Sequence, residues 1–207
     1  MLFRSGRSLR EELDVPASAV VLLYAGTMGG AQGLDSLVRA AAEFDRSRLV
    51  LLMAGSGTHE DGLRALTKRL RADSVQFLGR RPPEEMPDLY ATSDICYASL
   101  NDHPLARMTM PSKIQATLAS GKPLLVAARG DAREVALSSG AGFGSEPENV
   151  SSLVAALREI LAEGRPALSR RGVTAREFYQ STFSLETGVS RVEDALSHAV
   201  RSRGDRS

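Results

Sequence analysis

The sequence predicts an α/β fold, a Rossmann-like doubly wound parallel sheet of about six strands with helices on both faces. The first observation is a series of short, largely apolar runs of strand length, which indicate strands buried on both faces. These runs cover residues 20–26, 49–55, 75–79, 95–100, 124–128 and 142–144. The second observation is that segments of helical period alternate with the runs, as parallel neighbours require.

The segments between the runs divide the chain into three expected parts. Residues 1–16 form a linker or capping helix, 17–164 the Rossmann-like domain, and 165–207 C-terminal helices with a frayed tail. Within the domain, a strongly amphipathic helix begins at a cap formed by Asn149 or Ser151 and stops at Gly164-Arg165-Pro166. The other expected helices cover residues 33–44, 61–71, 84–92, 111–121 and 133–138. Because no strand follows Pro166, we expect the last helices to pack on something outside this chain.

The helix over 111–121 is the candidate floor of an active site. Pro111 suits its first turn and Gly121 the turn that ends it. Its start faces the binding edge of the sheet, where Ser112 and Lys113 lie among backbone N–H groups without intrahelical partners. The helix dipole and the lysine charge both favour a phosphate there.

Composition excludes several classes of protein. The 207 residues carry 26 Lys plus Arg against 25 Asp plus Glu, and this net charge of +1 gives no general attraction to nucleic acid or anionic lipid. The start is too polar for a signal peptide, and no apolar run approaches the ~20 residues of a transmembrane span. The single cysteine, Cys96, is expected to be a core residue. A cytoplasmic protein without a transmembrane segment fits best.

Two glycine-rich junctions follow the first two strands. In 26–33, glycines allow backbone N–H groups to approach a phosphate, although a loop of tight turns explains them equally well. The junction 55–62 begins like a dinucleotide-binding fingerprint. Glu60 replaces its last glycine, and the junction follows the second strand, which argues against NAD.

The third junction is positively charged, and the fourth is long. Gly79, Arg80 and Arg81 place two cations on the binding edge, where a base or a phosphate could bind, but surface arginines beside a rigid turn are an equal alternative. Residues 100–109 form the longest expected loop and lead into the helix over 111–121, as a substrate-binding loop often does. We find no metal-ligand pattern and no Ser/His/Asp arrangement supported by spacing.

A series of motifs in fixed order resembles the C-terminal half of the family 4 glycosyltransferases. They are Tyr24-Ala25-Gly26-Thr27 with Ala31-Gln32-Gly33-Leu34, Leu52-Met53-Ala54-Gly55-Ser56-Gly57, Val75-Gln76-Phe77-Leu78-Gly79, Leu89-Tyr90-Ala91-Thr92-Ser93-Asp94, and Pro111-Ser112-Lys113 through Gly121-Lys122-Pro123. The likeness covers about residues 9–162 and looks closest to the branch that adds amino sugars in surface-polysaccharide synthesis. It implies one half of a GT-B fold, in which this half holds the nucleotide-sugar and an N-terminal half holds the acceptor.

The resemblance assigns roles residue by residue. Lys113, with Arg107 nearby, would be the catalytic cation on the donor diphosphate. The donor would also contact Gly26, Thr27, Gly29, Gly30, Gln32, Gly55, Gly79, Arg80, Arg81, Thr109, Ser112 and Gln115. Four positions depart from the family pattern: Thr27 and Gln32 stand where many members carry an arginine and a lysine, and Met108 and Ala116 stand where the family has two glutamates. The lost second glutamate would have held the ribose hydroxyls.

The implied function is retaining transfer of a sugar from a nucleotide-diphosphate sugar, expected to be UDP-linked, to an acceptor in polysaccharide or glycoconjugate synthesis. No metal and no cofactor besides this substrate are implied, since no DxD sequence is present. The chain begins where the family's interdomain linker would lie. We therefore expect it to need an N-terminal partner domain or split subunit, to be inactive alone, and to expose an apolar patch that self-association could cover. The alternative is a non-catalytic nucleotide-binding or interaction module.

Overall fold

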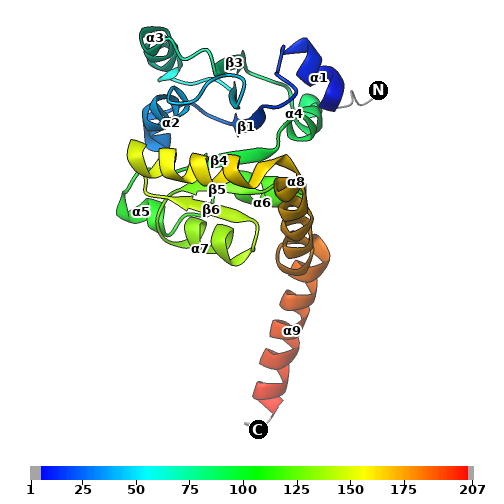
Figure 1. Cartoon of the computed structure of the whole chain (residues 1–207). Coiled ribbons are helices and arrows are strands. Elements are labelled where there is room, and N and C mark those ends of the chain that lie inside the picture. The colour runs from blue at the N-terminus through cyan, green and yellow to red at the C-terminus, as the bar shows by residue number, and fades with distance from the viewer. Residues whose placement is uncertain (1–5, 205–207) are drawn as a thin grey trace.

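The computed structural model describes residues 6–204 and contains one six-stranded parallel sheet (Figure 1). Its strand order is β3-β2-β1-β4-β5-β6, so the two strands that begin the two halves lie side by side in the middle. This order confirms the predicted doubly wound fold. The strands are β1 (Val20–Ala25), β2 (Leu49–Ala54), β3 (Val75–Gly79), β4 (Ile95–Ser99), β5 (Leu124–Ala127) and β6 (Gly142–Ser145).

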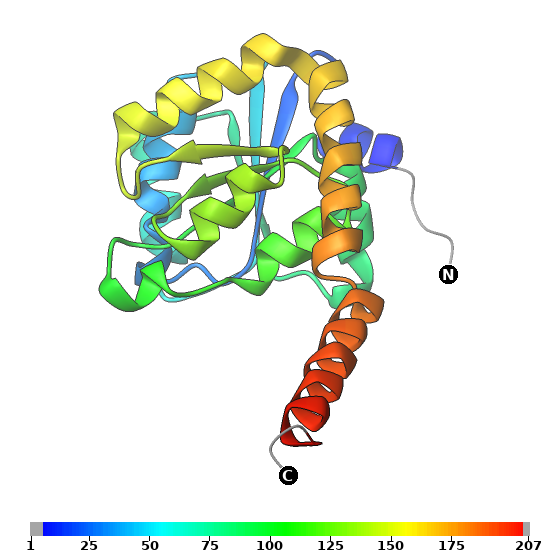
Figure 2. The same cartoon turned by 90° about the horizontal axis from the view of Figure 1, so that it is seen from below.

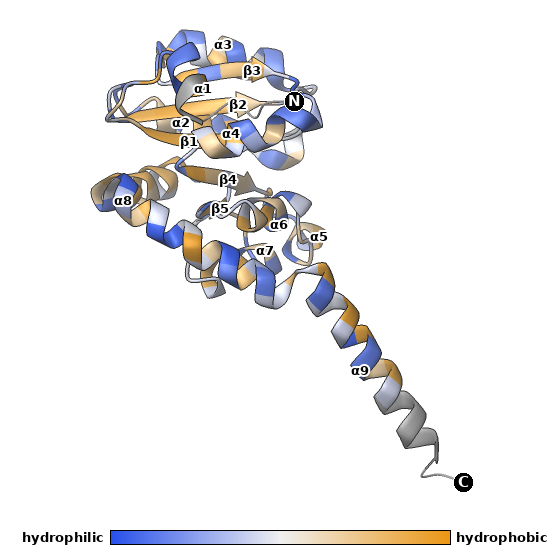
Figure 3. Ribbon diagram, turned by 90° about the vertical axis from the view of Figure 1, so that its right-hand side faces the viewer, coloured by the Kyte–Doolittle hydropathy of each residue, from blue (hydrophilic) through white to orange (hydrophobic). Residues whose placement is uncertain are grey.

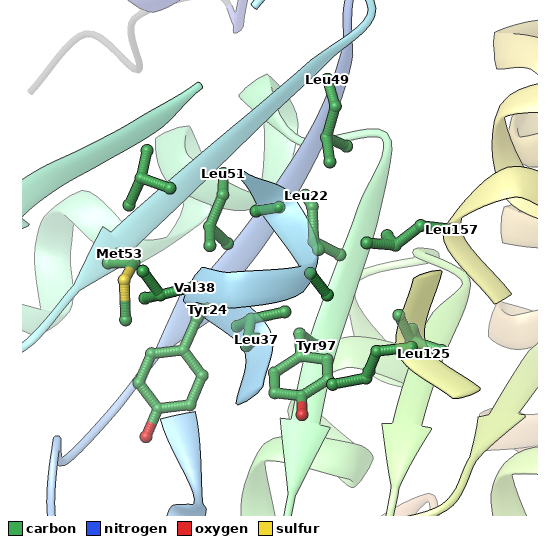
Figure 4. Close-up of a cluster of buried hydrophobic side chains, with 14 of the residues drawn as sticks. Leu22, Tyr24, Leu37, Val38, Leu49, Leu51, Met53, Tyr97, Leu125 and Leu157 are labelled. Atoms are coloured by element: carbon green, nitrogen blue, oxygen red, sulfur yellow. The ribbon is translucent and has the colours of Figure 1, made fainter. Parts of the chain in front are cut away.

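Helices cover both faces of the sheet, as the apolar strands predict. Successive residues of β1 alternate between two separate cores: Leu22 and Tyr24 belong to one, and Val21 and Leu23 to the other. Figure 4 shows part of the first core, in which side chains from β1, β2, β4 and β5 pack against side chains from two helices. Burial on both faces explains why these strands lack polar alternation.

The short helices divide between these two cores. α2 (Leu34–Ala41) and α3 (Glu60–Leu70) pack into the first core, whereas α4 (Met86–Thr92), α6 (Ser112–Ala119) and α7 (Asp131–Ser138) pack into the second. The remaining short elements are α1 (Gly6–Glu12), α5 (Pro104–Arg107), η1 (Gly30–Gln32) and η2 (Pro83–Glu85).

Two local expectations need correction. The predicted loop over 100–109 contains the one-turn helix α5, because Pro104 supplies a helical φ and the His103 ring accepts a hydrogen bond from the N–H of Leu105 at 3.3 Å. Pro111 has an extended conformation, with a ψ of 132°, and so caps α6 instead of forming its first turn.

The segment α8 (Val150–Thr182) consists of two helices joined at a kink, so the amphipathic helix that begins at Val150 ends at Gly164 as predicted. Its start is capped as predicted, since the Asn149 side chain accepts a hydrogen bond from the N–H of Ser152 at 2.9 Å. Gly164 has a φ of +73°, and the chain turns sharply before the helix resumes (Figure 2). The resumed segment packs on α6, where Gly172 lies against the Gly121 carbonyl with no room for a Cβ. Part of the C-terminal region therefore packs on this chain itself.

The last helix, α9 (Leu185–Gly204), extends away from the sheet (Figure 3), and four of its apolar residues are exposed. These are Leu185, Val189, Val192 and Leu196. Leu105 and Met108 are also exposed, at the edge of the sheet that carries the predicted site. None of the helices in the described range is long and apolar enough to cross a membrane.

Polar contacts at the opposite edge of the sheet join distant segments. The Asp94 carboxylate pairs with Arg10 of α1 and with Arg165 just beyond the bend in α8, and it accepts a hydrogen bond from the N–H of Val21 at 2.8 Å. Cys96 is buried, and its burial raises the pKa of the thiol to about 11. The expectation that it is a core residue is confirmed.

Candidate functional site

An open pocket of about 510 Å³ lies beyond the carboxyl ends of β1, β2 and β3. β1 leads to α2 on one face of the sheet, and its neighbour β4 leads to α6 on the other, so this edge contains the topological switch point where open α/β sheets bind ligands. The pocket is lined by Ala25, Gly26, Thr27, Ala54, Gly55, Ser56, Arg80, Arg81 and Met86. Five of the predicted contact residues, from three different junctions, therefore share one pocket.

The floor of the pocket is backbone, because glycines let two loops touch. Gly55 has a φ of +137°, and a Cβ on it would lie well inside 3.0 Å of the Gly26 carbonyl oxygen. The parallel ladder continues past the strands through hydrogen bonds from Gly26 N–H to Ala54 O and from Met28 N–H to Ser56 O, both 2.9 Å. Only glycine fits such an approach, which removes side chains from the surface that a ligand would meet.

Lys113 projects from the first turn of α6 over the end of β1. Its Nζ lies 4.4 Å from the centre of the Tyr24 ring and donates a hydrogen bond to the Tyr24 hydroxyl at 3.4 Å. The same Nζ would be 3.0 Å from a Cβ on Gly26, so it stands directly beside the first loop. Burial lowers the pKa of Lys113 to about 8, since a desolvated ammonium is less stable.

Backbone donors lie near this ammonium. The N–H groups in the first turn of α6, at Ser112 and Lys113, have no intrahelical acceptors. Within residues 6–204, the N–H of Thr27 also lacks a hydrogen-bond acceptor, although its neighbours Gly26 and Met28 are bonded to the second junction. Fixed dipoles and one charge thus favour an anion at the end of β1.

The third junction contributes the two arginines. Arg81 is held by hydrogen bonds from its Nε to Leu78 O and from its guanidinium to Glu85, both at 3.1 Å. Arg80 is exposed beside it. Gly79 connects this junction to the second, because its carbonyl accepts a hydrogen bond from the N–H of Gly55 at 2.8 Å.

The rest of the first loop is shaped by its own polar groups. The Gln32 side chain accepts a hydrogen bond from the N–H of Gly29 at 3.0 Å, and the Ser99 hydroxyl donates to the Gln32 carbonyl. Gly30 lies against His59 of the second junction. The Gln32 side-chain oxygen therefore stabilises the turn within the first loop.

Arg107 pairs with Asp102, with 2.8 Å between the guanidinium and the carboxylate. Asp102 also pairs with Arg129 at 3.2 Å, and this network fixes the loop before α6 to the end of β5. The Thr109 hydroxyl donates to the Leu105 carbonyl at 2.7 Å. Gln115, on α6, is half-buried. The two positions where the family has glutamates are both exposed: Met108 lies before α6, and Ala116 lies on it.

Sequence reasoning assigned no role to Tyr24, which the structure places under Lys113. A polar aromatic residue in an otherwise aliphatic strand, two positions before Gly26, is a signal that could have found it. Among the described residues, no group of three or more His, Cys, Asp or Glu side chains could hold a metal ion.

Comparison with known proteins identifies the family. The model of the glycosyl transferases group 1 matches residues 7–178. A D-inositol 3-phosphate glycosyltransferase of Kineococcus radiotolerans is 32% identical over 219 residues, covering 94% of this chain and 49% of the relative. WcaI of Escherichia coli (strain K12), provisionally named a colanic acid biosynthesis glycosyl transferase, is 27% identical over 182 residues, covering 86% and 43%.

Solved structures give the same result for the fold. Anabaena HepE, crystallised in complex with UDP, superposes with a TM-score of 0.79 at 21% identity, covering 93% of this chain and 52% of HepE. The chain spans about half the length of the curated relatives named above. With its six-stranded Rossmann-like sheet, its pocket at the switch point and the family match over most of its length, the chain belongs to the group 1 glycosyl transferases, which have the GT-B fold.

Proposed function

We propose that this chain is the donor-binding half of a retaining glycosyltransferase. It binds a nucleotide-diphosphate sugar, UDP-linked, and an N-terminal half of the kind found in GT-B enzymes supplies the acceptor. The sugar is transferred to an acceptor in polysaccharide or glycoconjugate synthesis, with a hexose or an acetamido sugar as the transferred group. The amino-sugar branch remains our expectation from the sequence motifs.

The observation that carries this proposal is the position of Lys113 beside the pocket. The ammonium and the first turn of α6 form a cationic end next to Gly26 and Thr27, suited to a diphosphate. The pocket continues from there to Arg80 and Arg81, with room for a nucleoside. HepE, which has the same fold, was crystallised with UDP.

The chemistry follows from where charge develops. As the bond between sugar and diphosphate lengthens, negative charge grows on the leaving phosphate oxygens. In the proposed complex, the Lys113 ammonium and the N–H groups at the start of α6 face those oxygens and stabilise the charge without reorganisation. The leaving phosphate can take the acceptor's proton, so the transfer needs no separate general base in this half.

A second candidate is a non-catalytic nucleotide-binding module. Met108 and Ala116 favour it, because neither can supply the carboxylate that the family uses at these positions. A charged hydrogen bond to the ribose is worth roughly 1.5–3 kcal/mol, and its loss weakens donor binding. The retained Lys113 and the backbone floor favour the first candidate.

Calorimetric titration of UDP, with uridine as the comparison, tests the proposal. We expect UDP to bind and uridine to bind far more weakly. Lys113→Met should weaken UDP binding about tenfold to a hundredfold, because one charged contact of about 1.5–3 kcal/mol is lost. Lys68→Met, the same change on an exposed face of α3, is the matched control. Equal affinity of wild type and Lys113→Met would remove Lys113 from the site.

The need for a second half is tested separately. We expect the chain alone to fold and bind UDP but to transfer no sugar, since one domain supplies one wall of the cleft. Adding the N-terminal half of a relative should restore the second wall. Robust turnover by the chain alone would contradict this part of the proposal.

A further inference from the structure

Tyr24 connects two parts of the site. Its side chain is fully buried at the end of β1. The hydroxyl donates a hydrogen bond to the carbonyl oxygen of Thr27 in the first loop. The ring lies under Lys113, whose Nζ is 4.4 Å from its centre and 3.4 Å from its hydroxyl. One side chain therefore contacts both the loop that ends β1 and the helix that follows β4.

Lys113 has little else to hold it. In the part of the chain that the structure describes, no carboxylate lies within 4.0 Å of its Nζ. A lysine stem is flexible, and an ammonium without a partner is unfavourable when buried. The negative face of the Tyr24 ring offsets part of that cost. Without the ring, the ammonium would move out into water.

We propose that Tyr24 is a positioning residue of the donor site. It holds the Lys113 ammonium over the first loop, and its hydrogen bond to the Thr27 carbonyl fixes the backbone of that loop next to the anion. This inference rests on the proposed function, because the anion is the diphosphate of the donor.

The titration of Lys113 reports its position directly. The titratable group in contact with Nζ is the Tyr24 phenol, and the adjacent buried phenol is that of Tyr97, 6.4 Å from Tyr24 between ring centres. Figure 4 shows the two rings side by side, with their hydroxyls directed the same way. Burial raises the pKa of both phenols, so neither ionises below pH 9. Loss of the ring alone would lower the pKa of a Lys113 that stays buried, so a rise in this pKa means that the ammonium has moved into water.

The experiment uses carbon-13-labelled lysine, since the chain has three lysines, at positions 68, 113 and 122, and three assignable signals. Tyr24→Leu should raise the pKa of Lys113 by at least one unit, toward its ordinary value of about 10.4, and weaken UDP binding at least about tenfold. Tyr24→Phe keeps the ring and should weaken UDP binding about threefold to tenfold through the lost hydroxyl. Tyr97→Phe is the matched control, because the Tyr97 hydroxyl makes no hydrogen bond to Lys113 or to the first loop. It should change neither quantity.

The outcomes separate this inference from the proposed function. If Lys113→Met weakens UDP binding but the Tyr24 variants match wild type in UDP affinity and in the Lys113 pKa, Tyr24 does not position Lys113 and only this inference fails. If wild type does not bind UDP, the proposed function fails, and the pKa of Lys113 in the Tyr24 variants still decides whether Tyr24 holds it. If Tyr24→Leu does not fold, Tyr24→Phe against Tyr97→Phe decides: equal UDP affinity of these two variants overturns the inference.

Discussion

Raising the pH from 7 to 9 should weaken UDP binding roughly tenfold. The perturbation is the titration of Lys113, because burial lowers the pKa of this residue to about 8. The charged form falls from about nine-tenths at pH 7 to about one-tenth at pH 9, and only that form attracts the diphosphate. The phosphate of UDP, with a second pKa of about 6, is already about nine-tenths ionised at pH 7 and only becomes more so as the pH rises. The loss of affinity is therefore assigned to the protein.

Binding of UDP also changes the pKa of Lys113. A bound diphosphate favours the ammonium, so binding raises the pKa of Lys113 above its value of about 8 in the free protein. Between these two pKa values binding takes up a proton, and affinity falls by up to tenfold for each pH unit. Below about pH 7 affinity should be flat with respect to this group.

The assay is calorimetric titration of UDP at four pH values in buffers of different ionisation enthalpy, which counts the protons taken up. Lys113→Met should bind UDP weakly at every pH, with no uptake assigned to this position. A wild-type affinity that stays constant from pH 7 to pH 9 would refute the reasoning, because it would mean that no group with a pKa of about 8 contacts the ligand.

The remaining predictions concern the floor of the pocket and the lost carboxylate. In urea denaturation, Gly55→Ala should lower the free energy of unfolding by at least ~2 kcal/mol, because the new Cβ would meet the Gly26 carbonyl. Gly62→Ala is the comparison, because Gly62 in α3 has free space around it. This change should raise the free energy of unfolding by about 0.5–1 kcal/mol. Ala116→Glu restores a carboxylate one turn beyond Lys113 and should tighten UDP binding about tenfold or more in calorimetry. No gain with Ala116→Glu would favour the non-catalytic module.

The sheet could be predicted because its signal is local. Each strand is a short apolar run, and the crossover helices follow from the parallel arrangement. The junction glycines could also be found from the sequence. The reason a position must be glycine, however, depends on which strands are neighbours in the sheet. Gly55 must be glycine because β2 lies beside β1 and its loop crosses the Gly26 carbonyl, and neither fact is local to residues 55–62.

The position of Arg107 could not be predicted, because its partner comes from another part of the fold. It lies six positions before Lys113, which suggests proximity. The loop before α6, however, packs its backbone against Gly130, where a Cβ would clash with the Arg107 carbonyl. The Arg107 guanidinium pairs with Asp102, which also binds Arg129 just beyond the end of β5. Arg107 therefore stabilises the loop, and Lys113 is left as the cation beside Gly26.

The strand order explains how Lys113, on a helix that follows β4, reaches the end of β1. Tyr24 points into the core on one face of the sheet, whereas the buried side chains of α6 belong to the core on the other face. Lys113 can contact Tyr24 only by reaching over the end of β1, and β1 and α6 meet there because β4, which precedes α6, is the neighbour of β1. The first loop leaves toward α2 on the opposite face. The ammonium therefore lies in the crevice between the two departing chain segments, where residues from both halves of the sheet can contact the same ligand.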